Sequence, residues 1–235
     1  MEPDDVDVVF VAGASGGTGR EVLRLLGGRE PTVRALTRSA GKRERLEAAG
    51  ADEVVIDDLL DPTDLAGALE SVDVVLSAVG SGVAEVWSSG AYVDGAGNLA
   101  LLEAAVEAGV DAFVMESALG VGDDPASALA TAFDLFISPV QRAKAEAETA
   151  VRAAPIRHTV LRPGALTSGP RTDNVTVAEP GARLWGLVSR ADVARLMVAA
   201  PTTPDAANRT FEVVATPSFH DRAVDVEWRL PGSEP

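Results

Sequence analysis

Short apolar runs alternate with longer segments of helical periodicity along most of the chain. Several of these runs are apolar at consecutive positions, which suits strands of a sheet that is covered on both faces. The alternation therefore predicts an α/β fold, a Rossmann-type doubly wound parallel sheet with helices on both faces. The expected strands are Val6 to Ala12, Thr32 to Thr37, Glu53 to Asp57, Asp73 to Val79, Ala112 to Glu116, Arg157 to Leu161 and Thr210 to Val214.

Helical patterns fill the intervals between these strands, and several carry start or stop signals. Asp61 before Pro62 is typical of an N-cap followed by proline at the first helical position, and Gly109 is typical of a helix end. Ser189 is a second candidate N-cap, with Asp192 in the first turn. The expected helices are Gly17 to Leu26, Gly41 to Ala49, Pro62 to Glu70, Gly90 to Ala108, Gln141 to Ala153 and Arg190 to Ala199.

Two stretches, 120–139 and 167–185, have weak periodicity and more proline, aspartate and glycine. Ligands of such sheets bind beyond the carboxyl ends of the strands. We therefore expect these stretches to be loops on the substrate side of the cleft. With 235 residues, 46% of them apolar, the chain can bury one substantial core, so we expect a single domain over 1–235.

A glycine-rich turn separates the first expected strand from the first expected helix. Gly13 can take the tight turn, Gly16 lets backbone amides approach a pyrophosphate, and Gly19 lets the helix pack closely on the sheet. The helix N-terminus adds unpaired N–H groups that favour an anion. This strand–turn–helix context predicts dinucleotide binding, and a purely structural turn is the alternative. The expected phosphate cradle consists of Gly13, Ser15, Gly16, Gly17, Thr18 and Gly19.

The formal net charge of −16 would repel nucleic acid and anionic membranes, and no basic patch offsets it. Lys42 and Lys144 are the only lysines, which we interpret as the mark of an acidic, salt-adapted proteome; the alternative is acidity that merely secures solubility. The acidic start lacks the positive region of a signal peptide, and no apolar run has membrane-spanning length. We expect a cytoplasmic protein with a small-molecule substrate, and an oligomer or protein partner stays open.

Cysteine is absent, which excludes disulfides, thiolate metal sites and cysteine nucleophiles. The two histidines, His158 and His220, lie far apart in the sequence, so we expect no histidine-based metal site. His158 falls inside an expected strand and fits a packed or edge histidine better than a catalyst.

Several short motifs in this order together form a pattern: Gly-Ala-Ser-Gly-Gly-Thr-Gly, Leu-Thr-Arg-Ser, Asp-Asp-Leu, Ser-Ala-Val-Gly, Glu-Ser-Ala-Leu-Gly, Lys-Ala-Glu-Ala-Glu, Leu-Arg-Pro-Gly-Ala-Leu-Thr and Ser-Arg-Ala-Asp-Val-Ala. From about Val6 to Val214 the chain resembles the short-chain dehydrogenase/reductase superfamily, in its atypical branch of NAD(P)-binding, NmrA-like and flavin-reductase-like proteins. The resemblance implies an NADP-dependent oxidoreductase that transfers hydride to a flavin- or quinone-like acceptor. The alternative is a non-catalytic NADP-binding redox sensor or scaffold, and a nucleotide-sugar epimerase or dehydratase is less favoured.

Arg38 ends the second expected strand, where an acidic residue would otherwise bond the adenosine ribose 2′-hydroxyl. A cation there favours a 2′-phosphate, which Ser39, Lys42 and Arg43 could assist, so we expect NADP(H) over NAD(H). The alternative is a solvated arginine at a strand end. By the resemblance, Asp58 and Leu59 match positions that contact the adenine ring, although Asp58 also fits a solvated loop.

Two further segments follow strands at the same edge of the expected sheet. Small residues after the fourth strand permit close approach to the ribose and pyrophosphate of the cofactor. By the resemblance, the segment after the sixth strand faces the nicotinamide amide, with proline fixing its turn. These two segments are Ser77, Ala78, Val79 and Gly80, and Pro163, Gly164, Ala165 and Leu166.

The resemblance also implies a catalytic serine after the fifth strand and a Tyr-x-x-x-Lys pair on the next helix. Ser117 matches the serine and Lys144 the lysine, but Val140 occupies the tyrosine position and cannot transfer a proton. Lys144 could still hold the nicotinamide ribose; its alternative role is a surface partner of Glu148. Ser117 could equally be an ordinary small residue at a strand end.

Overall fold

The computed structural model describes residues 1–81, 92–121, 128–172, 174–182, 184–215 and 222–229. Within these residues a nine-stranded sheet runs in the order β11-β8-β10-β6-β5-β4-β1-β2-β3. Its strands are β1 (Val8–Ala12), β2 (Thr32–Thr37), β3 (Glu53–Ile56), β4 (Val74–Ser77), β5 (Ala112–Glu116), β6 (Arg157–Pro163), β8 (Thr176–Ala178), β10 (Arg209–Val214) and β11 (Ala223–Val224).

All strand pairs from β3 across to β10 are parallel, which confirms the predicted doubly wound, Rossmann-like α/β fold. The chain runs outward from β1 to β2 and β3 and then returns to β4, which pairs with the other side of β1. The strand order therefore reverses between β1 and β4. In such sheets the carboxyl ends at this reversal form the cleft where ligands bind.

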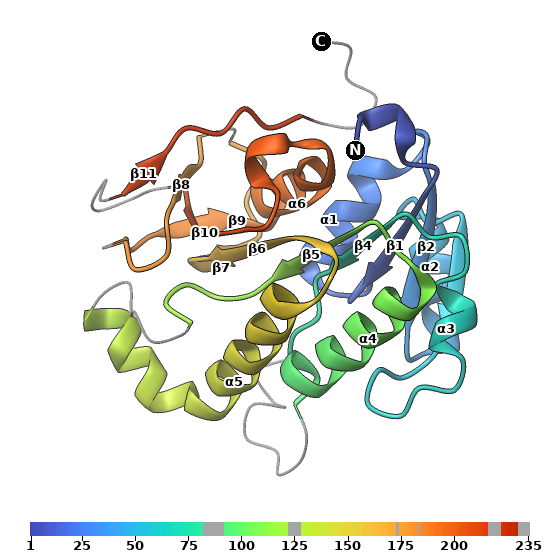
Figure 1. The fold of residues 1–235 in the computed structure, drawn as a ribbon, viewed down its shortest axis with the longest axis horizontal. Helices are drawn as coiled ribbons and strands as arrows, with labels where there is room; N and C mark the ends of the chain where they lie inside the picture. Colours follow the sequence, from blue (N-terminus) through green and yellow to red (C-terminus); the bar gives the residue numbers. More distant parts are fainter. Residues whose placement is uncertain (82–91, 122–127, 173, 183, 216–221, 230–235) are drawn as a thin grey trace.

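Helices cover both faces of the sheet (Figure 1). Consecutive residues of a strand point to opposite faces, so an apolar strand such as β1 contributes to the core on each side. Val9 and Val11 of β1 belong to a core with α1 (Gly17–Leu26) and α6 (Arg190–Ala199). Phe10 belongs to the opposite core, with α3 (Leu65–Ala68), α4 (Asn98–Ala108) and α5 (Ala128–Ala153). The shorter helical elements are η1 (Pro3–Asp5), η2 (Ala40–Lys42), α2 (Arg43–Glu47), the π-helical η3 (Val93–Gly97), η4 (Ala200–Thr202) and η5 (Pro204–Ala206).

Several elements begin and end where the sequence predicts. The bounds of β2, β5, α1 and α6 coincide with the expected ones. Ser189 caps α6 through a hydrogen bond that its side chain accepts from the Asp192 amide, and Gly109 ends α4 in the left-handed conformation with φ of +75°. Both signals act through the backbone groups that helix ends leave unpaired.

The predicted start of the third helix is wrong. Helix α3 begins at Leu65, and its N-cap is Asp64, which accepts a hydrogen bond from the Gly67 amide. The amides of Thr63 and Asp64 are instead bound by the Asp57 carboxylate, so the chain at Pro62 lies in the preceding turn. An acceptor six to seven residues earlier in the chain therefore displaces the predicted capping signal.

The predicted loop 120–139 is also partly wrong, because α5 already begins at Ala128. Residues 122–127 lie outside the described part of the chain. Alanine and leucine favour the helix and Pro139 lies inside it without ending it, so helix propensity outweighs the proline that suggested a break.

The second predicted loop, 167–185, contains the strand β8, which pairs antiparallel with β10. Beside it, β7 (Ala165–Thr167) and β9 (Leu187–Ser189) form a separate parallel pair. These strands are too short to show a period in the sequence. Among the described residues, no helix has the length and apolarity needed to cross a bilayer.

Candidate cofactor cleft

The glycine turn packs tightly between β1, α1 and the segment after β4. Gly13 has φ of +71°, and a Cβ on it would lie 2.2 Å from the Ala78 carbonyl oxygen. A Cβ on Gly19 would lie 2.3 Å from the Gly13 oxygen. Gly16 is the N-cap of α1 and offers no capping side chain. The first-turn amides of α1 therefore point toward the cleft as anion donors.

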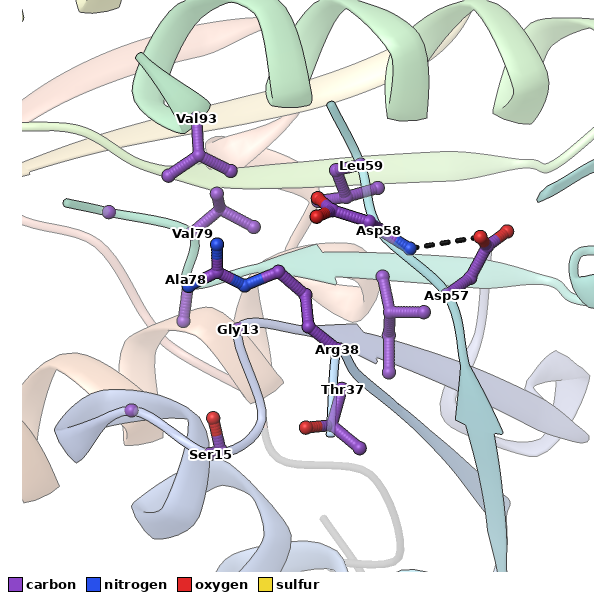
Figure 2. Close-up of a pocket in the computed structure, with 13 residues that line it drawn as sticks. Gly13, Ser15, Thr37, Arg38, Asp57, Asp58, Leu59, Ala78, Val79 and Val93 are labelled. Atoms are coloured by element: carbon purple, nitrogen blue, oxygen red, sulfur yellow. Dashed lines mark hydrogen bonds between the residues drawn. The ribbon is translucent and has the colours of Figure 1, made fainter. Parts of the chain in front are cut away.

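One pocket opens beside this turn, at the carboxyl ends of β1, β2, β3 and β4 (Figure 2). It brings together many of the residues predicted to bind the cofactor, from four separate stretches of the chain. Leu36, Thr37, Asp57 and Val93 also line it and were not predicted. The predicted residues that line it are Gly13, Ser15, Gly16, Arg38, Asp58, Leu59, Ala78, Val79 and Gly80.

Two cations stand at the β2 side of this pocket. Arg38 follows the last residue of β2, is exposed and projects into the pocket (Figure 2). The Lys42 ammonium donates a hydrogen bond of 3.1 Å to the Ser15 hydroxyl of the glycine turn. This end of the cleft therefore concentrates positive charge in a strongly acidic protein, which favours an anionic group there.

Two adjacent aspartates on the β3 side have different environments. Burial tends to raise the pKa of Asp57, but hydrogen bonds from the Thr63, Asp64 and Asp58 amides and from the Thr63 hydroxyl outweigh it and lower that pKa. Asp57 thus stays ionised and shapes the loop. Asp58 is half-buried, lines the pocket and accepts a hydrogen bond from the Leu60 amide.

Lys144 lies at the β4 side of the cleft. Its ammonium pairs with Asp94 Oδ1 at 3.0 Å, so the alternative of a surface partner for Glu148 is wrong. The other oxygen of Asp94 accepts hydrogen bonds from the Ser81 amide and hydroxyl. The Lys144 ammonium lies 4.0 Å from the point that a Gly80 Cβ would occupy. Gly80 lines the pocket, so the buried Lys144 ammonium lies next to the pocket wall without lining the pocket itself.

Glu116, the last residue of β5, is a buried acid that sequence reasoning missed. It accepts a 2.9 Å hydrogen bond from the Thr18 hydroxyl in the first turn of α1. Burial raises its pKa, against the opposing effects of Lys144, the Thr18 hydrogen bond and Arg190. A charged residue ending an otherwise apolar strand, Ala-Phe-Val-Met-Glu, was the available signal.

Ser117 belongs to a different cluster, further along the same side of the sheet. Its hydroxyl donates a 2.6 Å hydrogen bond to Glu148, which accepts further hydrogen bonds from Arg162. Arg162 also pairs with Glu212 at 3.1 Å. Burial raises the pKa of Glu212 to about 7, against the opposing charge and hydrogen bond of Arg162. We call Ser117, Glu148, Arg162 and Glu212 the sheet cluster.

The segment Pro163–Leu166 is held in place through its backbone. The Pro163 oxygen accepts a hydrogen bond from the Leu119 amide, and the Gly164 amide donates to Val213. A Cβ on Gly164 would lie 2.4 Å from the Gly186 oxygen. Close packing against two strands therefore explains glycine here, and the segment leaves β6 at its carboxyl end.

Three other residues do not line the pocket. The Ser77 hydroxyl is fully buried and bonds Asn98 of α4. Val140 is buried on α5, where it offers no proton-transfer group. His158 lies in the amino-terminal half of β6, at the opposite edge of the sheet, and its Nδ1 contacts the Ile156 oxygen, which confirms a packed histidine. His220 lies outside the described residues.

Comparisons with known proteins agree with this architecture. A family model described as NAD(P)H-binding matches residues 13–204. The uncharacterized sugar epimerase YhfK of Bacillus subtilis (strain 168) is 30% identical over 206 residues, covering 87% of this chain and 92% of that protein. The NAD(P)H azoreductase of Xenophilus azovorans is 28% identical over 215 residues, covering 88% of this chain and 67% of the azoreductase. A solved structure from Bacillus halodurans, described as a candidate NAD-dependent epimerase/dehydratase, superposes with a TM-score of 0.78 at 26% identity, covering 89% of this chain and 94% of that one.

Proposed function

The chain belongs to the NAD(P)H-binding family, and from this we propose that it is an NADP(H)-dependent oxidoreductase that transfers hydride to a planar flavin- or quinone-like acceptor. The observation that carries the proposal is the pocket itself. Arg38 lines it together with Gly13 and Gly16, so one cleft joins a phosphate-binding turn to a cation suited to a 2′-phosphate.

Each part of the cleft has a role in this proposal. The amides at the start of α1 bind the pyrophosphate, while Arg38 and Lys42 bind the 2′-phosphate. Lys144, oriented by Asp94, donates to the nicotinamide ribose. The bound cofactor supplies the hydride, and the protein orients it and excludes water.

The acceptor class follows from the valine at the tyrosine position. Because Val140 is buried and apolar, it cannot deliver a proton to a substrate oxygen in the way a tyrosine would. Flavins and quinones accept hydride and can take their proton from water. The azoreductase relative supports reduction of a conjugated acceptor. A sugar epimerase activity, which the name of the B. subtilis relative suggests, is less favoured because that chemistry usually needs the tyrosine.

A specific observation also favours a second function, a non-catalytic NADP(H) sensor. The Ser117 hydroxyl, which would be the remaining catalytic group beside the missing tyrosine, is already engaged by Glu148. A protein of this kind would bind the cofactor tightly and act on no acceptor.

The test is to incubate the purified protein with NADPH and a panel of flavins, quinones, azo dyes and enones, and to follow the absorbance of the reduced nicotinamide. We expect turnover with at least one planar acceptor and none with Gly16→Asp. Gly16 is an exposed N-cap, a position that aspartate favours, so this variant places a negative charge at the pyrophosphate site. A Cβ here would lie 3.1 Å from the Gly13 oxygen, so the unfolding temperature of the variant is measured alongside its activity. Ala153→Asp, an exposed substitution at the end of α5, is the matched control.

The outcomes separate the candidates. Tight NADPH binding without turnover on any acceptor would favour the sensor, and conversion of nucleotide sugars would favour the epimerase.

Arg38→Ala tests the cofactor choice, because it should weaken NADP binding about tenfold or more and NAD binding far less. Equal losses for the two cofactors would contradict the preference for NADP(H).

A further inference from the structure

We propose that Arg190 is a second phosphate-binding cation of the cleft, which holds the phosphate on the nicotinamide side of the bound dinucleotide. The inference rests on the proposed function and adds to it a residue of the Ser-Arg-Ala-Asp-Val-Ala motif. Arg190 is the first residue of α6 and lies against Gly17 at the start of α1, outside the lining of the pocket, whereas Arg38 lines the pocket at the β2 side.

The side chain of Arg190 lies over the start of α1. A Cβ on Gly17, the first residue of α1, would lie 2.4 Å from Arg190 Cδ and 2.5 Å from Nε. Gly17 therefore has no side chain because Arg190 occupies that space. This places a cation against the first helical turn, whose unpaired amides already favour an anion.

The guanidinium group reaches from there toward the predicted nicotinamide segment. Nη1 lies 3.4 Å from the Leu166 carbonyl oxygen and 3.3 Å from the Ser168 hydroxyl. Both distances are at the long end for hydrogen bonds, and both use one nitrogen of a group with several donors. The half-buried Arg190 thus spans the gap between the glycine turn and the segment after β6.

A buried carboxylate lies on the inner side of this gap. Glu116 is bonded to Thr18 of the same helical turn and feels the charges of both Lys144 and Arg190. Cations therefore flank the carboxyl ends of the sheet: Arg38 and Lys42 at the adenosine end, and Lys144 and Arg190 at the nicotinamide end. Arg38 and Lys42 are assigned to the 2′-phosphate, so Arg190 supplies a cation for the pyrophosphate, beside the amides of α1.

Measured affinities for three ligands test whether Arg190 contacts the second phosphate of the pyrophosphate. NADPH and 2′-phospho-ADP-ribose carry that phosphate, and adenosine 2′,5′-bisphosphate lacks it. Arg190→Met keeps an unbranched apolar stem over Gly17 and removes the charge. We expect it to weaken the first two ligands about tenfold or more, as for loss of a charge-assisted hydrogen bond, and the bisphosphate less than about twofold. Arg190→Lys should recover part of the affinity.

Two further variants test whether this pattern of affinities is specific to Arg190. Arg38→Ala should weaken all three ligands, because each carries the 2′-phosphate. Gly17→Ala should reproduce the Arg190→Met pattern, since its methyl group would displace the flexible side chain of Arg190 rather than the backbone. Arg24→Ala, an exposed change in the last turn of α1, is the control and should leave all three affinities unchanged.

Equal affinity of wild type and Arg190→Met for NADPH would overturn the inference while leaving the proposed function intact. An equal loss for all three ligands with a lowered unfolding temperature would overturn it too, because it would indicate a purely structural role at the α1–α6 contact. If the wild-type protein binds none of the three ligands, the proposed function fails as well.

Discussion

Helix α5 carries two buried charges one turn apart, and they belong to clusters of different kinds. Lys144 pairs with Asp94 and faces the space left by Gly80 at the cofactor cleft. Glu148, four residues later, accepts hydrogen bonds from Ser117 and Arg162 inside the sheet cluster. The first cluster lies against the pocket wall at Gly80, and for this reason we propose a binding role for its cation. The second is closed on itself, so its charges serve the fold.

The difference shows why a matching motif position does not assign a role. Ser117 and Lys144 both match catalytic positions of the resembling superfamily. In the structure Lys144 lies beside the cofactor cleft, whereas the Ser117 hydroxyl donates a hydrogen bond to Glu148 within the sheet cluster. Four substitutions, taken in order of expected effect, test whether this division into a binding cluster and a folding cluster holds.

Arg162→Met should have the largest effect, on stability. It leaves the buried carboxylates of Glu148 and Glu212 without the cation between them. We expect the free energy of unfolding to fall by about 3 to 5 kcal/mol, measured by urea denaturation. The combined variant with Glu148→Leu and Glu212→Leu should recover much of that loss, because no buried charge is then left unpaired. A loss below about 1 kcal/mol in the single variant would contradict a folding role.

Lys144→Met should have a different profile, a large loss of function together with a moderate loss of stability, because the buried Asp94 loses its cation. We expect kcat/KM for NADPH oxidation to fall about a hundredfold, equivalent to about 2.7 kcal/mol of transition-state binding. Asp94 keeps its hydrogen bonds from Ser81, so the fold should lose less than Arg162→Met does. Arg142→Met, at an exposed position of the same helix, is the control. If Lys144→Met instead lost stability alone, the two clusters would not differ in kind.

The two clusters also mark how far the sequence could be interpreted. Gly13 and Gly19 could be predicted because their turn, strand and helix are adjacent in the sequence, and local rules govern them. Glu116 could not be connected to Thr18, nor Arg190 to Gly17, because in each pair the partners are far apart along the chain and meet only after the sheet forms. Asp64 replaced the predicted cap at Asp61 for a different reason, since the Asp57 carboxylate, just after β3, binds the amides of Thr63 and Asp64.

The short strands β7, β8 and β9 were predicted least well. Strands β7 and β9 have three residues each, too few for a period of two to be recognised, and their pairing depends on Gly186 fitting against Gly164. Their positions decide where Leu166 and Arg190 lie. The nicotinamide side of the cleft therefore needed a structure, whereas the adenosine side followed largely from the glycine turn and Arg38.

The pH dependence of the unfolding free energy tests Glu212 of the sheet cluster, with a smaller expected effect than the two substitutions above. The pKa of Glu212 rises from 4.5 to about 7 on folding, mainly because of burial. Between these two pH values Glu212 is protonated in the folded protein and ionised in the unfolded chain. The contribution of Glu212 to stability is therefore fully present below about pH 4.5 and is lost as the pH rises toward 7. Arg162, Glu148 and the Gly120 amide are the groups that act on it.

Glu212→Gln removes this titration. Relative to the variant, the wild type should lose about 1 to 3 kcal/mol of unfolding free energy between pH 4.5 and 7, measured by urea denaturation at a series of pH values. Parallel pH curves for wild type and Glu212→Gln would show that Glu212 is not protonated in the folded protein.

Ser117→Ala should have the smallest effect and gives the most direct test of the comparison. If the serine belongs to the sheet cluster, its loss removes one buried hydrogen bond to Glu148, which keeps its bonds from Arg162 and Arg152. The unfolding free energy should then fall by about 1 kcal/mol while kcat for NADPH oxidation stays within about threefold of wild type. A catalytic serine predicts the reverse, unchanged stability and a loss of rate of about a hundredfold or more. Measuring the unfolding free energy and kcat on one protein sample therefore decides whether Ser117 serves the fold, as the sheet cluster predicts, or the reaction.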